Sequence, residues 1–121
     1  MRNTSETKMY EYHCKVVRVV DGDTVDVDID LGFGIVYSNQ RVRLYGIDAP
    51  ESRTRDLAEN KLGKDATKFL EGALGETCIL RTKLDKKGKY GRILGEFYAN
   101  AFDISINEQM IQAGHAKRYM K

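Results

Sequence analysis

An alternation of apolar and acidic residues over positions 25–31 constrains the fold of this chain more than any other feature. The apolar positions are Val25, Val27, Ile29 and Leu31, and the acidic positions between them are Asp26, Asp28 and Asp30. This period of two predicts a strand with its apolar face in the core and its aspartates in solvent. We interpret the acidic face as solvated, and not as a cation site. Valine-rich residues 10–20 precede the strand, and residues 35–47, with Val42 and Leu44 inward, follow it. Three adjacent strands without an intervening helix indicate a meander.

The rest of the chain predicts two helices and two further strands. Residues 57–74 carry an apolar stripe with helical spacing and precede Gly75, a favourable helix terminator; the stripe consists of Leu62, Ala66, Phe69, Leu70 and Ala73. Strands are expected at 78–84 and 93–98. A second helix is expected from Ser105 to Gly114, because Ser105 and Glu108 have capping-box spacing. Five short strands with a helix after the third are typical of an oligonucleotide-binding (OB) barrel. We therefore expect a mainly β fold with helices (α+β), a five-stranded OB-fold barrel with two to three α-helices.

The chain has 121 residues, which suits one domain. Residues 10–121 are predicted to form that domain, and the polar residues 1–9 a flexible leader. Residues 1–60 carry 8 Lys/Arg and 11 Asp/Glu, whereas residues 61–121 carry 12 and 7. This asymmetry is compatible with a cation site beside a phosphate-attracting surface, and equally with scattered solvated charge.

Several classes of protein and site are disfavoured. No apolar run approaches the roughly 18–20 residues of a membrane-spanning helix, so no membrane partner is expected. The first residues lack the apolar segment of a secretory signal. The sequence leaves two alternatives for the location of the protein. It is either intracellular or encoded by a mobile element, or it is secreted and its signal has already been removed. Cys14 and Cys78 are too distant for a CxxC pattern and are interpreted as small buried apolar residues. With two histidines in the chain, any metal is expected to be held by oxygen atoms.

The most informative motif is residues 42–51, VRLYGIDAPE. Pro50 ends the strand and leaves the carbonyl of Ala49 free to bind a ligand. An ion pair between an arginine and a glutamate at the surface would explain these charges by structure alone. The loop that follows a rigid strand is, however, a common place for functional side chains. The charged and aromatic side chains here are Arg41, Arg43 and Tyr45 on one strand face, then Asp48 and Glu51 at the exit.

Two other motifs are ambiguous by themselves. In residues 20–24, VDGDT, Asp21 and Asp23 project to one side, where their repulsion requires a cation or a proton; alone, the motif is a common turn. Residues 89–92, KYGR, place an arginine beside a tyrosine on which a base can stack, or form a solvated hairpin turn. The basic and aromatic tail over 115–121 is interpreted as a frayed end.

Together, residues 20–24, 42–51 and 89–92, in this order along the chain and with a helix between the last two, resemble the staphylococcal nuclease (thermonuclease) domain from about His13 to Tyr119. The resemblance implies a five-stranded barrel and calcium-dependent hydrolysis of DNA and RNA, with single-stranded or frayed substrates preferred and a monomeric enzyme. It implies these roles: Asp23, Asp48 and the backbone carbonyl of Ala49 as Ca²⁺ ligands, Asp21 in the outer shell, Glu51 acting on the attacking water, Arg43 and Arg92 gripping the reacting phosphate, and Lys89 and Tyr90 contacting the nucleotide.

One geometric condition and one alternative function accompany this hypothesis. Arg43 and Asp48 would face opposite sides of a regular strand, so we predict that Gly46 lies in a bulge or that the strand ends before Asp48. The alternative function is a non-catalytic OB-fold module that binds nucleic acid or protein. Such modules usually have eroded charged positions, whereas here all five are present: Asp23, Arg43, Asp48, Glu51 and Arg92.

Overall fold

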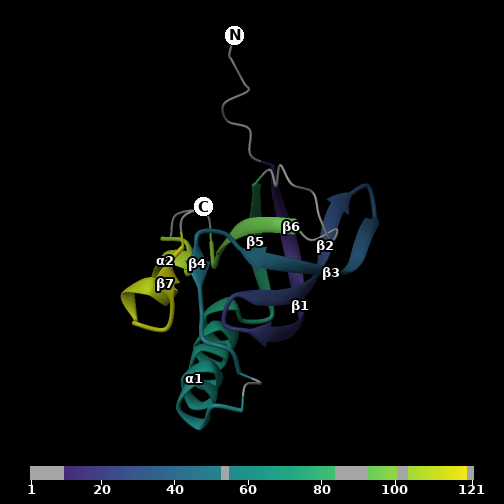
Figure 1. The fold of residues 1–121 in the computed structure, drawn as a ribbon. Coiled ribbons are helices and arrows are strands. Elements are labelled where there is room, and N and C mark those ends of the chain that lie inside the picture. Colours follow the sequence, from purple (N-terminus) through teal and green to yellow (C-terminus); the bar gives the residue numbers. More distant parts are fainter. Residues whose placement is uncertain (1–9, 53–54, 84–92, 101–103, 120–121) are drawn as a thin grey trace.

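Five strands close into a barrel in the computed structural model of the chain, which describes residues 10–52, 55–83, 93–100 and 104–119 (Figure 1). The strand order around the barrel is β1-β2-β3-β6-β5, and β5 pairs with β1 to close it. β3 and β6 are parallel, and the other neighbours are antiparallel. The strands are β1 (Glu11–Asp21), β2 (Thr24–Gly32), β3 (Ile35–Leu44), β5 (Thr77–Lys83) and β6 (Ile93–Tyr98). The predicted OB-type barrel is therefore confirmed.

Two helices and a small second sheet complete the described fold. Helix α1 (Leu57–Leu74) has the predicted bounds and ends at Gly75, which has a φ of 66°. Helix α2 (Ile106–Gln112) begins after Ser105, whose hydroxyl accepts a hydrogen bond from the Glu108 backbone N–H, as its spacing predicted. The second sheet pairs β4 (Ile47–Asp48) with β7 (Lys117–Arg118). The leader predicted over residues 1–9 lies outside the described residues.

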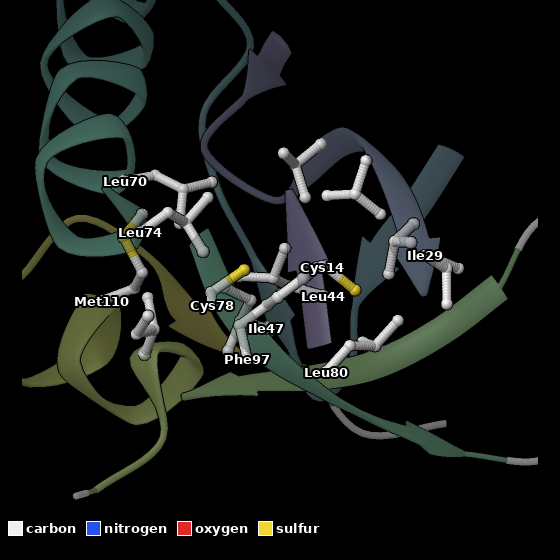
Figure 2. Close-up of a cluster of buried hydrophobic side chains, with 14 of the residues drawn as sticks. Cys14, Ile29, Leu44, Ile47, Leu70, Leu74, Cys78, Leu80, Phe97 and Met110 are labelled. Atoms are coloured by element: carbon white, nitrogen blue, oxygen red, sulfur yellow. The ribbon is translucent and has the colours of Figure 1, made fainter. Parts of the chain in front are cut away.

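The hydrophobic core fills the barrel and continues beneath both helices. Figure 2 shows Leu70 and Leu74 of α1 and Met110 of α2 beside barrel side chains such as Phe97 and Leu44. The inward positions Val25, Val27, Ile29, Val42 and Leu44 are buried as predicted. The same cluster therefore joins the barrel to both helices.

The structure corrects three expectations about exposure. Leu62 is 57% exposed, because the buried face of α1 is Gly63, Ala66, Leu70 and Leu74. Leu31 is also exposed, since a register shift between Asp30 and Gly32 interrupts the alternation near the end of the β2–β3 hairpin. Asp26 is buried rather than solvated, because the Arg41 guanidinium covers it from the neighbouring strand.

The tail and the cysteines can also be compared with prediction. Lys117 and Arg118 are not frayed: they pair with β4, and the Tyr119 N–H donates to the Gly46 carbonyl at 2.8 Å. Cys14 and Cys78 are buried free thiols, as expected, and burial raises the pKa of each to about 12. In the part of the chain that the structure describes, neither helix has the length and apolar character to cross a membrane.

Candidate active site

The turn between β1 and β2 places Asp23 at the end of the barrel with little freedom to move. Its side chain accepts hydrogen bonds from the Ala49 N–H and from the Thr24 hydroxyl, each at 3.0 Å. Its backbone carbonyl accepts the Leu44 N–H at 2.8 Å. Asp23 is 9% exposed. These bonds join residues 20–24 to both ends of residues 42–51, although the two motifs are distant in sequence.

Arg43 lies between the two carboxylates that sequence analysis assigned to a metal site. Its Nη1 atom is 3.0 Å from Asp23 Oδ2, and its Nη2 atom is 3.7 Å from Asp48 Oδ1. Nη1 is buried and makes no hydrogen bond of suitable geometry, although it lies close enough to Asp23 for an ion pair. The charge of this buried donor is offset by the Asp23 carboxylate beside it, while the Arg43 side chain keeps 18% of its surface exposed. Asp48 is more open, with 55% of its side chain exposed.

The chain between Arg43 and Asp48 turns, which brings both residues to one side. β3 ends at Leu44, Tyr45 and Gly46 form a turn, and Gly46 has a φ of 80°, a conformation that glycine adopts without strain. This confirms the prediction that no unbroken strand runs to Asp48. The Asn107 side chain fixes the turn by donating to the Tyr45 carbonyl at 2.8 Å.

Two glycines allow the loops of the site to pack directly against α1. A Cβ atom at Gly22 would lie 2.8 Å from the Ala66 Cβ and 2.9 Å from the Ala49 Cβ, so the Asp-Gly-Asp turn approaches the helix as only glycine permits. A Cβ at Gly63 would collide with the backbone of Glu51 and Ser52. The loop carrying Glu51 therefore lies on the surface of α1 at Gly63.

Comparison with known proteins identifies the family to which these motifs belong. Residues 41–121 match the family described as staphylococcal nuclease homologue. The chain belongs to the staphylococcal nuclease family. A thermonuclease of Staphylococcus hyicus is 33% identical over 105 residues, covering 85% of this chain and 57% of that protein. An uncharacterized endonuclease of Escherichia coli is 33% identical over 109 residues, covering 90% of this chain and 62% of that protein.

Other relatives of this staphylococcal nuclease family member differ in length. Endonuclease YhcR of Bacillus subtilis is 31% identical over 116 residues, which are 90% of this chain but 9% of that protein. An uncharacterized protein of Bacillus anthracis is 35% identical over 103 residues, 44% of its length. The chain thus spans about half the length of several curated relatives that it matches.

The donor atoms of the site suit a hard cation. Asp23 and Asp48 have carboxylate oxygens beside the same guanidinium, and the Ala49 N–H bonds to Asp23. Among the described residues, no group of three or more His, Cys, Asp or Glu side chains is placed to hold a metal ion. A site of two carboxylates would therefore need carbonyl and water oxygens, which calcium accepts readily because it takes 6–8 oxygen ligands.

The remaining predicted residues are distributed around this centre or outside the described chain. Asp21 accepts a hydrogen bond from the Ser52 hydroxyl at 2.6 Å. Glu51 is exposed, and its N–H donates to Glu59 at 3.4 Å. Lys89, Tyr90 and Arg92 lie outside the described residues. Their roles, like those assigned to the other site residues, stay predictions.

Sequence reasoning missed two residues that organise the site. Ser52 ties Asp21 to the loop that carries Glu51, and the Asn60 side chain holds the Ser52 carbonyl at 2.9 Å. Asn107 is almost fully buried and joins the Tyr45 turn to β6. A signal for Asn107 exists in the sequence, since an amide beside Ile106 and before Met110 occupies the apolar face of a short helix. Ser52 has no comparable signal.

Proposed function

We propose that this staphylococcal nuclease family member is a calcium-dependent nuclease that hydrolyses phosphodiester bonds of DNA and RNA with little sequence specificity. We further propose that it acts as a monomer and prefers single-stranded or frayed substrates. The observation that supports this most strongly is the Arg43 guanidinium, which lies 3.0 Å from Asp23 and 3.7 Å from Asp48 and so brings both carboxylates and a cation to one site. Relatives named endonuclease and thermonuclease support the same reaction class.

The residues match the electrostatic demands of phosphodiester hydrolysis. Attack on phosphorus increases negative charge on the phosphate oxygens, and a nucleophile is repelled by the charge already there. Calcium, when bound through Asp23, Asp48 and the Ala49 carbonyl, would supply positive charge next to these oxygens. Arg43 would donate two N–H groups from its planar fork to the phosphate, and each well-placed donor can lower the barrier by ~3–4 kcal/mol.

Glu51 is proposed to orient and deprotonate the attacking water. It is exposed at the barrel end, on a loop whose backbone is packed on α1, so the carboxylate can reach solvent while its backbone is held. Such a base contributes ~10²–10⁴-fold in rate. Asp21 would act from the outer shell through its bond to Ser52. Arg92 would contact the same phosphate as Arg43, and the pair Lys89 and Tyr90 would contact the nucleotide.

Cleavage of a labelled single-stranded oligonucleotide, with calcium or with EGTA, tests the function. We expect EGTA to abolish cleavage, and Glu51→Gln to lower the rate by ~10²–10⁴-fold with an unchanged melting temperature. The matched control is Glu71→Gln on the exposed face of α1, which should cleave normally. Calcium should raise the melting temperature of the wild type but not of Asp23→Asn.

Three results would contradict parts of this proposal. Cleavage that persists in EGTA would exclude the role of calcium. A wild-type rate in Glu51→Gln would remove the assignment of the base. Binding of the oligonucleotide in calcium without turnover would support the alternative, a non-catalytic binding module of the same family.

A further inference from the structure

A second arginine lies beside Arg43 and is held in a similar way. Arg41 is two residues earlier in β3, on the same face, which corresponds to about 7 Å along the strand. Its Nε and Nη2 atoms bond to Asp26 Oδ1 and Oδ2 at 2.8 and 3.1 Å. In the β2–β3 register Asp26 is opposite Arg41, just as Thr24 is opposite Arg43. Each of the two guanidiniums thus has a carboxylate beside it: Asp23, in the turn just before β2, for Arg43, and Asp26, within β2, for Arg41.

Asp26 also lies below a third arginine from the strand on its other side. Arg18 of β1 is opposite Asp26 in the register, with Nη2 3.8 Å from Asp26 Oδ2. The Asp26 side chain is 10% exposed, whereas the Arg41 and Arg18 side chains are 52% and 57% exposed. One buried carboxylate thus pairs with two solvent-facing guanidiniums. Together the three side chains, Asp26, Arg41 and Arg18, carry one net positive charge.

Stability alone gives a weak reason for this arrangement. Ion pairs with exposed partners contribute little to folding, and a desolvated carboxylate is costly unless it is well bonded. A guanidinium that is already oriented loses less freedom on binding an anion. Asp26 engages two of the five N–H donors of Arg41, so further donors of the same group can bind a ligand.

We propose that Arg41, oriented by Asp26, binds the phosphate adjacent to the one at Arg43. Arg18 extends the same positive surface across β2. This inference rests on the proposed nuclease function and deepens it. The protein would bind at least two successive phosphates of the substrate along the outer faces of β3 and β2. Arg41 is a positioning residue, because it acts on a phosphate that does not react.

Binding of a fluorescent single-stranded oligonucleotide in EGTA, followed by anisotropy over a range of salt concentrations, tests this inference without requiring turnover. The principal variant is the double substitution Asp26→Asn with Arg41→Gln, which leaves the net charge of the chain unchanged and no carboxylate unpaired. The matched control is Glu11→Gln with Arg81→Gln, an ion pair between β1 and β5 with a 2.6 Å contact. The single variant Arg41→Gln, whose amide can still donate to Asp26, covers the case in which the double variant does not fold.

We expect Kd to rise about fivefold to tenfold in the principal variant and the slope of log Kd against log salt to fall by about 0.7, the contribution of one phosphate contact on a single strand. The control should bind within about twofold of the wild type. In cleavage assays KM should rise for the oligonucleotide with kcat unchanged, and a dinucleoside monophosphate, which has one phosphodiester, should show no change in KM.

Unchanged affinity and salt slope in both Arg41 variants, or an equal loss in the Glu11–Arg81 control, would overturn the inference. A wild-type protein that binds the oligonucleotide but does not cleave it in calcium would contradict the nuclease function alone, and the binding comparison in EGTA would still decide the role of Arg41. A wild-type protein that neither binds nor cleaves the oligonucleotide, in calcium or in EGTA, would refute both proposals.

Discussion

The Asn107 side chain makes a prediction that can be worked out from its bonds. Its Oδ1 atom accepts the Phe97 N–H at 3.1 Å, and its Nδ2 group donates to the carbonyls of Tyr45 and Gly95 at 2.8 and 3.1 Å. β3 ends at Leu44, so the side chain continues the seam between β3 and β6 where backbone pairing stops. We predict that Asn107→Ala strongly destabilises the fold.

The size of the effect follows from the groups left without partners. The Gly95 carbonyl still accepts the Tyr45 N–H at 2.8 Å, so it stays satisfied. The Phe97 N–H loses its bond in a buried position, and an unsatisfied group of this kind costs about 1–3 kcal/mol. The Tyr45 carbonyl also loses its bond, at a partly buried position where the cost is smaller. The free energy of unfolding should therefore fall by roughly 2–4 kcal/mol, a large part of the ~5–15 kcal/mol typical of a domain.

Urea unfolding followed by far-ultraviolet circular dichroism measures this loss. Gln112→Ala, an exposed amide at the end of the same helix, is the matched control and should change the free energy by no more than about 0.5 kcal/mol. A loss of less than ~1 kcal/mol in Asn107→Ala would contradict this prediction, because it would mean that the two backbone groups find other partners at little cost.

Two further substitutions test the packing of α1 and the charge of Asp26. Gly63→Ala should destabilise the protein by ~1–3 kcal/mol and reduce cleavage, because the new methyl group would displace the Glu51 loop. Gly72→Ala, on the same helix with open space around it, should instead stabilise it by ~0.5–1 kcal/mol, and equal effects of the two in urea unfolding would contradict this. The hydrogen bond from Arg41 lowers the pKa of Asp26 below its ordinary 3.8, so its stabilisation is complete above that pH and is lost as pH falls through the lowered value. The stability difference between wild type and Asp26→Asn should accordingly be constant near neutral pH and shrink in acid; a pH-independent difference would show that the carboxylate charge does not matter.

Local patterns were sufficient for most elements of the fold. The bounds of α1, the Ser105 cap and the inward positions of β2 follow from periodicity and capping, which depend on residues a few positions apart. The need for a turn near Gly46 also followed from the alternation of side chains along a strand, since Arg43 and Asp48 are an odd number of residues apart. The three charged motifs could be recognised for the same reason, because each is contiguous.

Short-range patterns in the chain indicate the barrel-forming order of strands and helices and the charged groups available for phosphate chemistry. Three contacts became visible only in the folded protein: Asp26 is buried beneath Arg41 and Arg18, Lys117 and Arg118 form a strand with β4, and the Asn107 side chain closes the seam beside Tyr45. The cause is distance along the chain. Each of these contacts joins residues whose pairing depends on how the barrel closes, and a local pattern carries no information about which partner will neutralise a charge or satisfy a backbone group.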